Sequence, residues 1–419
     1  MNSQVVLLRR VLPAIVAGAC LSFACGTDWL QFRGNDGTGV APDANLPVAW
    51  GKKESVDKND LGENIAWRAD LPGRGVSGPI VVGGKVIVTS TSGVKHDRLH
   101  VLAFDVASGK LLWERQFWAT GRTLCHPTSS VAAPTPASDG ESIFAFYSSN
   151  DLVCLDLDGN LKWFRGLGYD SPTAANDVGM AASPLVVGKT VVVQVENKGD
   201  SFAAGLDTAT GETRWRLARE QSMNWTSPAV LRGKQPADDA VLLQSPGVLS
   251  ALRPETGDLL WSYATGCSII PSLTTDKGLV YLPASGLTAL KPSDRPGSHV
   301  EVAWSEAKLG PGSSSPVVYD GKVYVINGAP ALTCADAKTG KVLWRLRLSG
   351  KFWATPVLAG DHLYCVNDQG LAQVVELGEQ GKIAAENDFG EPVLGTPAVA
   401  DGAIYFRGDS HLFKIASER

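Results

Sequence analysis

The sequence predicts an all-β protein, an eight-bladed β-propeller of four-stranded antiparallel blades. Two recurring marks and the residues between them predict this fold. A Trp residue returns at intervals of 40 to 52 residues, usually just after a Gly-containing turn, and a small residue next to Pro follows most of them. Short runs of β-branched and aromatic residues, which favour strands, lie between the marks. The recurring residues are Trp67, Trp113, Trp163, Trp215, Trp261, Trp304 and Trp344.

The composition is that of a folded, turn-rich protein. The chain has 419 residues, with 45 Gly, 24 Pro and 19% charged residues. Disordered chains are charge-rich and poor in aromatic residues, and collagen needs a strict Gly period, so both classes are excluded. The 38 basic and 43 acidic residues give a net charge of −5. Nucleic-acid binding needs a clustered basic excess, so no nucleic-acid partner is predicted.

Residues 1–24 have the pattern of a signal peptide. Arg9 and Arg10 precede a mostly apolar run of 14 residues, Val11–Ala24, which is too short for a typical membrane span. We therefore expect export to the periplasm or cell envelope. Cleavage after Ala24 would leave Cys25 at the N-terminus, as in a bacterial lipoprotein, while Cys20 offers a competing site. A lipid anchor at Cys25 and free secretion both remain open.

Residues 25–64 are expected to form an extended leader, and the repeats follow it. Each unit reads as a strand, a Gly turn, a strand, a short loop, a strand, a Thr-Gly turn and a last strand. Glycine permits the positive φ angles that tight turns need. The Pro marks count eight units, with Pro271-Ser272 standing for the fifth. The others are Pro79, Pro136, Pro184, Pro228, Pro316, Pro356 and Pro397.

The propeller, residues 65–419, is expected to close by pairing its two ends. The last unit, Thr396–Ile415, contains only three strands, whereas the strand at Ile65–Leu71 has no blade of its own. We therefore expect Ile65–Leu71 to be the outer strand of the eighth blade. This closure removes free sheet edges.

The repeat resembles a known family. The pattern Asp336-x-x-Thr-Gly-Lys-x-x-Trp344, with Ser-Pro-Val-Val at residues 315–318, is similar to the pyrroloquinoline-quinone-like (PQQ-like) propeller repeat, and the likeness covers Ile65–Ile415. The leader Asp28–Gly34 resembles the start of many exported proteins with this repeat. The resemblance implies one of two bacterial groups. One is the quinoprotein alcohol dehydrogenases, and the other is non-enzymatic envelope proteins, including outer-membrane assembly-factor lipoproteins.

The sequence favours the non-enzymatic group. Quinoprotein dehydrogenases, by the same resemblance, place an adjacent Cys-Cys disulfide against the cofactor and use a calcium ion with acidic and amide ligands. This chain has no adjacent Cys pair and no haem or zinc spacing. Asp156-x-Asp158-Gly159 resembles a calcium loop faintly and is predicted to be a hairpin turn. No catalytic residue, metal or cofactor is predicted, and PQQ with calcium belongs only to the dehydrogenase alternative.

The repeat Trp residues are predicted to pack between blades rather than to bind a ligand. Cys154 and Cys334 fill a column that holds Ala or Gly in other units. They lie about half a turn apart in an eight-bladed ring, so they cannot form a disulfide. Pairing among Cys125, Cys267 and Cys365 remains open.

Insertions in blades one to three predict a partner-binding surface on one rim. They carry the binding candidates Trp118, Arg122, His126 and Tyr169. Trp225 and Trp353 lie outside the Trp column and should open on the same face, at the mouth of the central channel, where they either bind a partner or ligand or simply fill the funnel with bulky side chains. Aromatic and Arg residues are enriched at binding hot spots. We therefore expect a monomeric scaffold that binds an envelope protein, with a dehydrogenase or a sensor of a small ligand in the funnel as alternatives.

Overall fold

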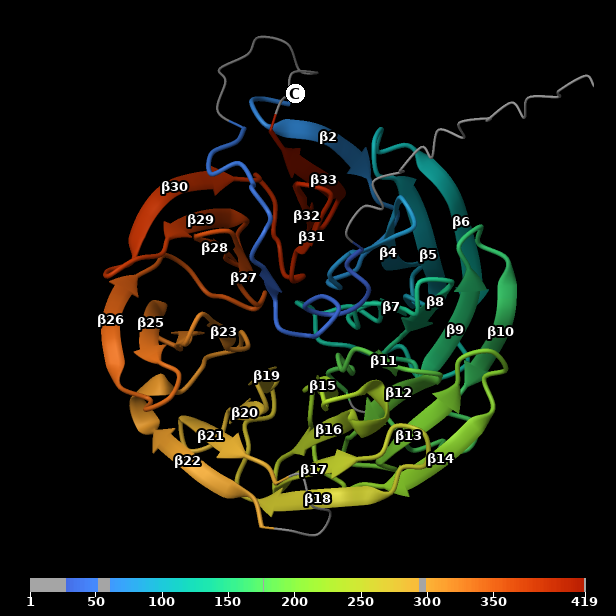
Figure 1. The fold of residues 1–419 in the computed structure, drawn as a ribbon. Helices are drawn as coiled ribbons and strands as arrows, with labels where there is room; N and C mark the ends of the chain where they lie inside the picture. Colours follow the sequence, from blue (N-terminus) through green and yellow to red (C-terminus); the bar gives the residue numbers. More distant parts are fainter. Residues whose placement is uncertain (1–27, 52–60, 176, 294–298, 418–419) are drawn as a thin grey trace, which may run out of the picture.

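The protein is an eight-bladed propeller, as the sequence predicts (Figure 1). The computed structural model describes residues 28–51, 61–175, 177–293 and 299–417. The predicted signal peptide, residues 1–24, and the lipidation candidate Cys25 lie outside this range. Each blade is a four-stranded antiparallel sheet, and the hydrophobic core lies in layers between neighbouring blades. In the described part of the chain, neither of the two short helices is long and apolar enough to cross a membrane.

The strands follow one another from the channel outward in blades one to seven. Blades one to four contain β3 (Ile80–Val82), β4 (Lys85–Ser92), β5 (Arg98–Asp105) and β6 (Leu111–Trp118); β7 (Ala137–Ser138), β8 (Ser142–Phe146), β9 (Asp151–Asp156) and β10 (Leu161–Gly166); β11 (Leu185–Val187), β12 (Thr190–Val195), β13 (Phe202–Asp207) and β14 (Thr213–Ala218); β15 (Ala229–Leu231), β16 (Ala240–Ser245), β17 (Val248–Leu252) and β18 (Leu259–Ala264).

The remaining elements continue the pattern. Blades five to eight contain β19 (Thr274–Asp276), β20 (Leu279–Leu282), β21 (Leu287–Lys291) and β22 (Glu301–Glu306); β23 (Val317–Tyr319), β24 (Lys322–Ile326), β25 (Ala331–Asp336) and β26 (Val342–Arg347); β27 (Val357–Ala359), β28 (His362–Val366), β29 (Leu371–Glu376) and β30 (Lys382–Asp388); β31 (Ala398–Ala400), β32 (Ala403–Arg407), β33 (His411–Ala416) and β2 (Ile65–Asp70). The 3-10 helices are η1 (Pro236–Asp238) and η2 (Ala307–Leu309).

The eighth blade closes the ring as predicted. β2 pairs antiparallel with β33, which places Ile65 opposite Ile415 and Asp70 opposite His411. The strand from the N-terminal part of the chain is therefore the outer strand of the last blade. The backbone pairing between β2 and β33 therefore closes the ring.

The repeat Trp residues pack between blades, which confirms their structural assignment. The indole N–H of Trp67 donates to Val106 O of the next blade at 3.0 Å, and that of Trp163 donates to Thr208 O at 3.0 Å. A Cβ on the turn residue Gly109 would lie 2.6 Å from the Trp67 indole. This turn therefore needs Gly both for space and for its φ of 69°. Cys334 lies opposite Trp344 across the β25–β26 pair, where a small side chain is required.

The Asp residues before the Thr-Gly and Ser-Gly turns hold those turns by hydrogen bonds. Asp105 Oδ1 accepts from Ser108 N at 2.8 Å, and Asp336 Oδ1 accepts from Thr339 N at 2.8 Å. The calcium-like segment is also a hairpin turn, because Asp156 Oδ1 accepts from the backbone N–H groups of Asp158 and Asn160. These carboxylates shape turns in the manner expected for Asp.

The leader runs across the channel on the face that carries the Gly turns (Figure 1). Trp29 exchanges two backbone hydrogen bonds with Val81 of blade one. Further along, β1 (Val40–Ala41) pairs in parallel with β27 of blade seven, which gains a fifth strand. The sequence did not indicate this position. Residues 28–50 act as a plug, which we call the leader plug.

The middle of the leader plug contacts further blades. Leu30 O accepts from Ser138 N of blade two, and Asp36 forms an ion pair with Arg232 after the first strand of blade four, at 3.0 Å. Arg33 Nη2 donates to Leu273 O, at the entry to blade five, at 2.7 Å. Through these contacts, one short segment connects blades that are far apart in the sequence.

Candidate functional site

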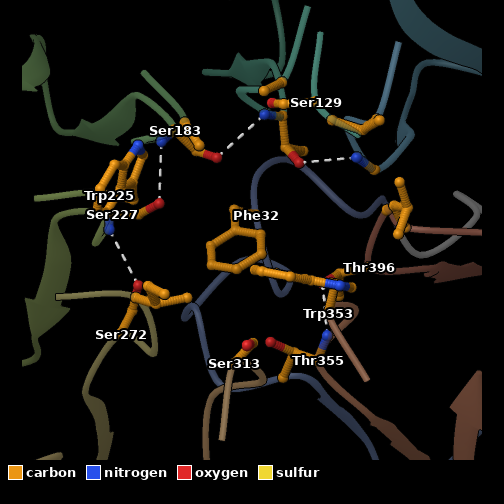
Figure 2. A pocket seen from close by; sticks show the side chains of 18 of the residues that line it. Phe32, Ser129, Ser183, Trp225, Ser227, Ser272, Ser313, Trp353, Thr355 and Thr396 are labelled. Atoms are coloured by element: carbon orange, nitrogen blue, oxygen red, sulfur yellow. Dashed lines mark hydrogen bonds between the residues drawn. The ribbon is translucent and has the colours of Figure 1, made fainter. Parts of the chain in front are cut away.

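The channel is reduced by the leader plug to a blind cavity of about 420 Å³, which we call the funnel cavity. It is lined by residues at the entry of the innermost strands and by inter-blade loops, so it opens on the face opposite the Gly turns. Phe32 of the leader plug projects into its middle (Figure 2). The size falls within the range of about 300–1,000 Å³ that is usual for small-molecule sites.

A ring of Ser and Thr hydroxyls surrounds the base of this cavity (Figure 2). Each hydroxyl oxygen accepts a hydrogen bond from the backbone N–H of the equivalent residue in the preceding blade, as in Thr355 N to Thr396 Oγ1 at 3.0 Å. In blade one the position is Gly78, which donates to Thr135 but has no hydroxyl. The members of this hydroxyl ring are Thr135, Ser183, Ser227, Ser272, Ser315, Thr355 and Thr396.

The sequence contained a signal for this ring. The residue next to each Pro mark is small, and in seven of eight units it also bears a hydroxyl. A merely small residue would serve for close packing, but only Ser or Thr can accept the neighbouring N–H. All seven side chains are more than nine-tenths buried. The ring therefore links the blades and lines the cavity at the same time.

Three of the predicted binding residues, His126, Trp225 and Trp353, line the funnel cavity. The indole N–H of Trp225 donates to Gly179 O at 2.9 Å, which fixes that ring against the wall. Trp353 is 47% exposed, and its indole N–H makes no hydrogen bond to the described residues. Both Trp residues line this cavity, and their role in binding stays a prediction.

The residues that line the cavity include no Asp, Glu, Lys or Arg, and His126 is the single imidazole among them. The Arg33 guanidinium does not line the cavity, but its carbon lies 5.1 Å from the centre of the Phe32 ring. Burial lowers the pKa of Arg33 to about 9, because the charged form is deprived of water. The cavity wall itself is neutral.

The other three predicted residues lie on a separate surface at the edge of blades one to three. The inter-blade loops 119–136 and 167–184 have 18 residues each, whereas the corresponding loops elsewhere have 9 or 10. With loops 93–97 and 196–201 and with Trp118 at the end of β6, they form a raised surface, which we call the rim. Trp118 is 66% exposed, with the Arg98 guanidinium 5.5 Å from its ring centre.

A second hollow lies within the rim and brings Arg122 and Tyr169 together, with Asn150 and Pro172 among the other lining residues. Arg122 forms an exposed ion pair with Asp177 at 2.7 Å, and Tyr169 is 78% exposed. The six predicted residues therefore occupy two adjoining regions of one face rather than a single site.

The five cysteines in the described residues are all free thiols. Cys154 and Cys334 are unpaired, as predicted, and no bond joins Cys125, Cys267 and Cys365. Burial raises the pKa of the Cys267 thiol to about 12. The buried thiols of Cys154, Cys334 and Cys365 act as small apolar side chains, whereas Cys125 and Cys267 are half-buried.

Together, the repeat, the ring closure and the plugged channel define a PQQ-like repeat β-propeller. The chain belongs to the family described as outer membrane protein assembly factor BamB, whose profile matches residues 28–179, 173–268 and 284–379. A curated relative of the same description, from Alkalilimnicola ehrlichii, is 27% identical over 189 residues. That match covers 45% of this chain and 43% of the relative, so it spans less than half of the relative's length.

Solved structures share the fold at low sequence identity. BamB from Moraxella catarrhalis is 18% identical with a TM-score of 0.62, covering 85% of this chain and 98% of that one. A europium-containing methanol dehydrogenase is 15% identical with a TM-score of 0.70, covering 93% and 98%. A quinohemoprotein alcohol dehydrogenase from Comamonas testosteroni is 13% identical with a TM-score of 0.69, covering 94% and 81%. Likeness at this level establishes the architecture alone.

The funnel cavity does not fit the quinone and calcium that the dehydrogenase alternative implies. That alternative needs acidic metal ligands, an adjacent Cys pair and a carboxylate base. No Asp, Glu or Cys lines this cavity. Among the described residues, no group of three or more His, Cys, Asp and Glu side chains could hold a metal ion. No catalytic step is therefore derived for this cavity.

Proposed function

We propose that the protein is exported to the bacterial cell envelope and acts there as a non-enzymatic scaffold that binds a protein partner on its rim. Membership of a family described as outer membrane assembly factors supports the envelope location and the scaffold role. The N-terminal pattern of Arg9, Arg10 and the following apolar run supports export, with Cys25 as the residue that would carry a lipid.

This proposal rests on one observation: the longer strands and loops of an otherwise regular ring are concentrated in blades one to three. β4 and β5 have eight residues each, while the second and third strands of the other blades have four to six. The two 18-residue loops are adjacent and lie on one face. In repeat proteins, insertions concentrated on one face often form the binding surface.

The exposed side chains of the rim suit a protein partner. Trp118 and Tyr169 present large aromatic surfaces, and Arg122 adds a planar cation that can pair with a partner carboxylate. Both aromatic residues combine an apolar body with a polar edge, and such residues bury a large area with few rotatable bonds. The exposed Arg122–Asp177 pair can open for a partner because exposed ion pairs contribute only about 0–1 kcal/mol.

Site-specific photo-crosslinking in cells tests this proposal. A photo-reactive residue at Tyr169 should give a discrete adduct with one envelope protein. The same residue at Lys341, on the opposite turn face, is the matched control and should give none. An adduct at Lys341 with none at Tyr169 would move the binding surface to the other face, and no adduct at either position would remove the support for a scaffold.

A further inference from the structure

We propose that the funnel cavity binds a neutral saccharide unit, with an apolar face of the sugar on Phe32 and its peripheral oxygens toward the hydroxyl ring. This inference does not rest on the partner-binding proposal, because Trp118, Arg122 and Tyr169, which carry that proposal, do not line the cavity.

The first argument is the unused hydrogen-bonding capacity of the hydroxyl ring. All seven oxygens accept a backbone N–H, and within the described residues none of the seven O–H groups donates to the protein. A hydroxyl is both a donor and an acceptor, so each can still donate one bond into the cavity. Buried donors of this kind need acceptor oxygens, which water or a polyol can supply.

The second argument is the shape of the site. Figure 2 shows Phe32 in the middle of the ring, with Ser183, Ser227, Ser272, Thr355 and Thr396 around it. A flat apolar centre inside a circle of donors matches a sugar ring, whose faces carry C–H groups and whose edge carries oxygens. Trp225 and Trp353 add aromatic walls. The indole N–H of Trp353 remains available for a further bond to the ligand.

The third argument is charge. The lining has no Asp, Glu, Lys or Arg, so a charged ligand would enter without an ion-pair partner. The Arg33 guanidinium lies under the Phe32 ring, and it is not among the groups that line the cavity. The volume of about 420 Å³ suits a ligand of one or two sugar rings.

Calorimetry with three probes on the purified chain tests the inference: methyl β-glucopyranoside, the two-ring sugar cellobiose, and glucuronate as the charged analogue. We expect saturable binding of a neutral sugar and weaker binding of glucuronate. Trp353→Ala should weaken sugar binding by about tenfold, since aromatic contacts contribute on that scale. Trp118→Ala, outside the cavity, should bind sugar as the unchanged protein does.

A second pair of variants tests the hydroxyl ring itself. Thr396→Ser keeps a hydroxyl and should retain most of the affinity, whereas Thr396→Val should lose it, with folding of both checked by circular dichroism. If the Val variant does not fold, the Trp353→Ala comparison still decides. Three results would overturn the inference: no saturable binding of either neutral sugar, tighter binding of glucuronate, or full affinity in Trp353→Ala. None of them bears on crosslinking at Tyr169.

Discussion

Ile65 pairs with Ile415, so the first and last strands of the propeller share one sheet and close the ring. Deleting Ile65–Leu71 should therefore destabilise the whole propeller, because β33 would lose its outer partner strand and the Trp67 indole would be missing between blades eight and one. The single change Trp67→Ala should lower the free energy of unfolding by about 3–5 kcal/mol. Urea denaturation measures both, with the exposed Trp118→Ala as control. Unchanged unfolding after the deletion would show that closure does not depend on β2.

The hydroxyl ring should contribute measurably to stability. Thr355 Oγ1 accepts from Ser315 N at 3.2 Å, and Thr355 is 2% exposed. Thr355→Val keeps the shape but leaves that buried N–H without an acceptor, which should cost about 1–3 kcal/mol. Thr355→Ser retains the acceptor and should cost clearly less. Equal destabilisation by both variants in thermal or urea unfolding would argue against the hydrogen bond as the cause.

Acid should weaken the turn that follows β13. The hydrogen bond from the Arg214 guanidinium, together with turn N–H groups, lowers the pKa of Asp207 from 3.8 to about 2. A carboxyl whose pKa is lower in the folded state stabilises the fold fully above its unfolded pKa. That contribution is lost as the pH falls from about 4 to about 2. It should be under about 1 kcal/mol, because the pair is partly exposed.

The Asp207→Asn variant should consequently show a shallower loss of stability than the unchanged protein over this pH range. Arg214→Met should raise the pKa of Asp207 toward 3.8, which carboxyl NMR titration can follow. A pKa of Asp207 that does not respond to Arg214→Met would mean that the turn N–H groups alone set it.

Partner capture should depend on the rim. Replacing Trp118 and Arg122 by Ala should weaken it by about 1–3 kcal/mol for each true hot spot. The fold should survive, since exposed substitutions usually change stability by less than about 0.5 kcal/mol. The matching substitutions of Lys110 and Lys341 on the turn face should leave capture intact. Crosslinking yield at Tyr169 provides the readout, and the reverse pattern would contradict the assignment.

Reconstitution with PQQ and calcium should give no alcohol oxidation, because no carboxylate lines the cavity to hold the ion or to act as a base. The assay uses an artificial electron acceptor. Turnover that disappears when the quinone is omitted would favour the dehydrogenase alternative over the scaffold.

The blades could be predicted because their determinants are local. Each Trp, turn Gly and Pro mark lies within one repeat, and Trp67 without a blade pointed to the closure. The leader plug could not be predicted, because its contacts are distant in sequence: Arg33 and Leu273 are separated by 240 positions. The sequence of residues 28–50 has no repeating pattern that would indicate which strands this segment contacts.

The same contrast between local and long-range determinants explains why only part of the candidate site could be predicted. Trp225 and Trp353 stood out from a repeated column, so their place at the channel mouth followed from the alignment of units. Phe32 did not, because it reaches the cavity only through the leader plug. The hydroxyl ring is visible in the sequence as the small residue beside each Pro mark, but the sequence alone does not indicate that its oxygens accept N–H groups from the preceding blade.

The position of the leader plug also determines which face of the ring lies close to Cys25. Asp28 accepts a hydrogen bond from Gly83 N in the first Gly turn, on the face away from the funnel cavity. Cys25 lies three residues earlier, a stretch that spans at most about 11 Å. A lipid on Cys25 would therefore hold the turn face against the bilayer. The funnel mouth and the rim would then point into the aqueous compartment, where soluble domains and sugars are found.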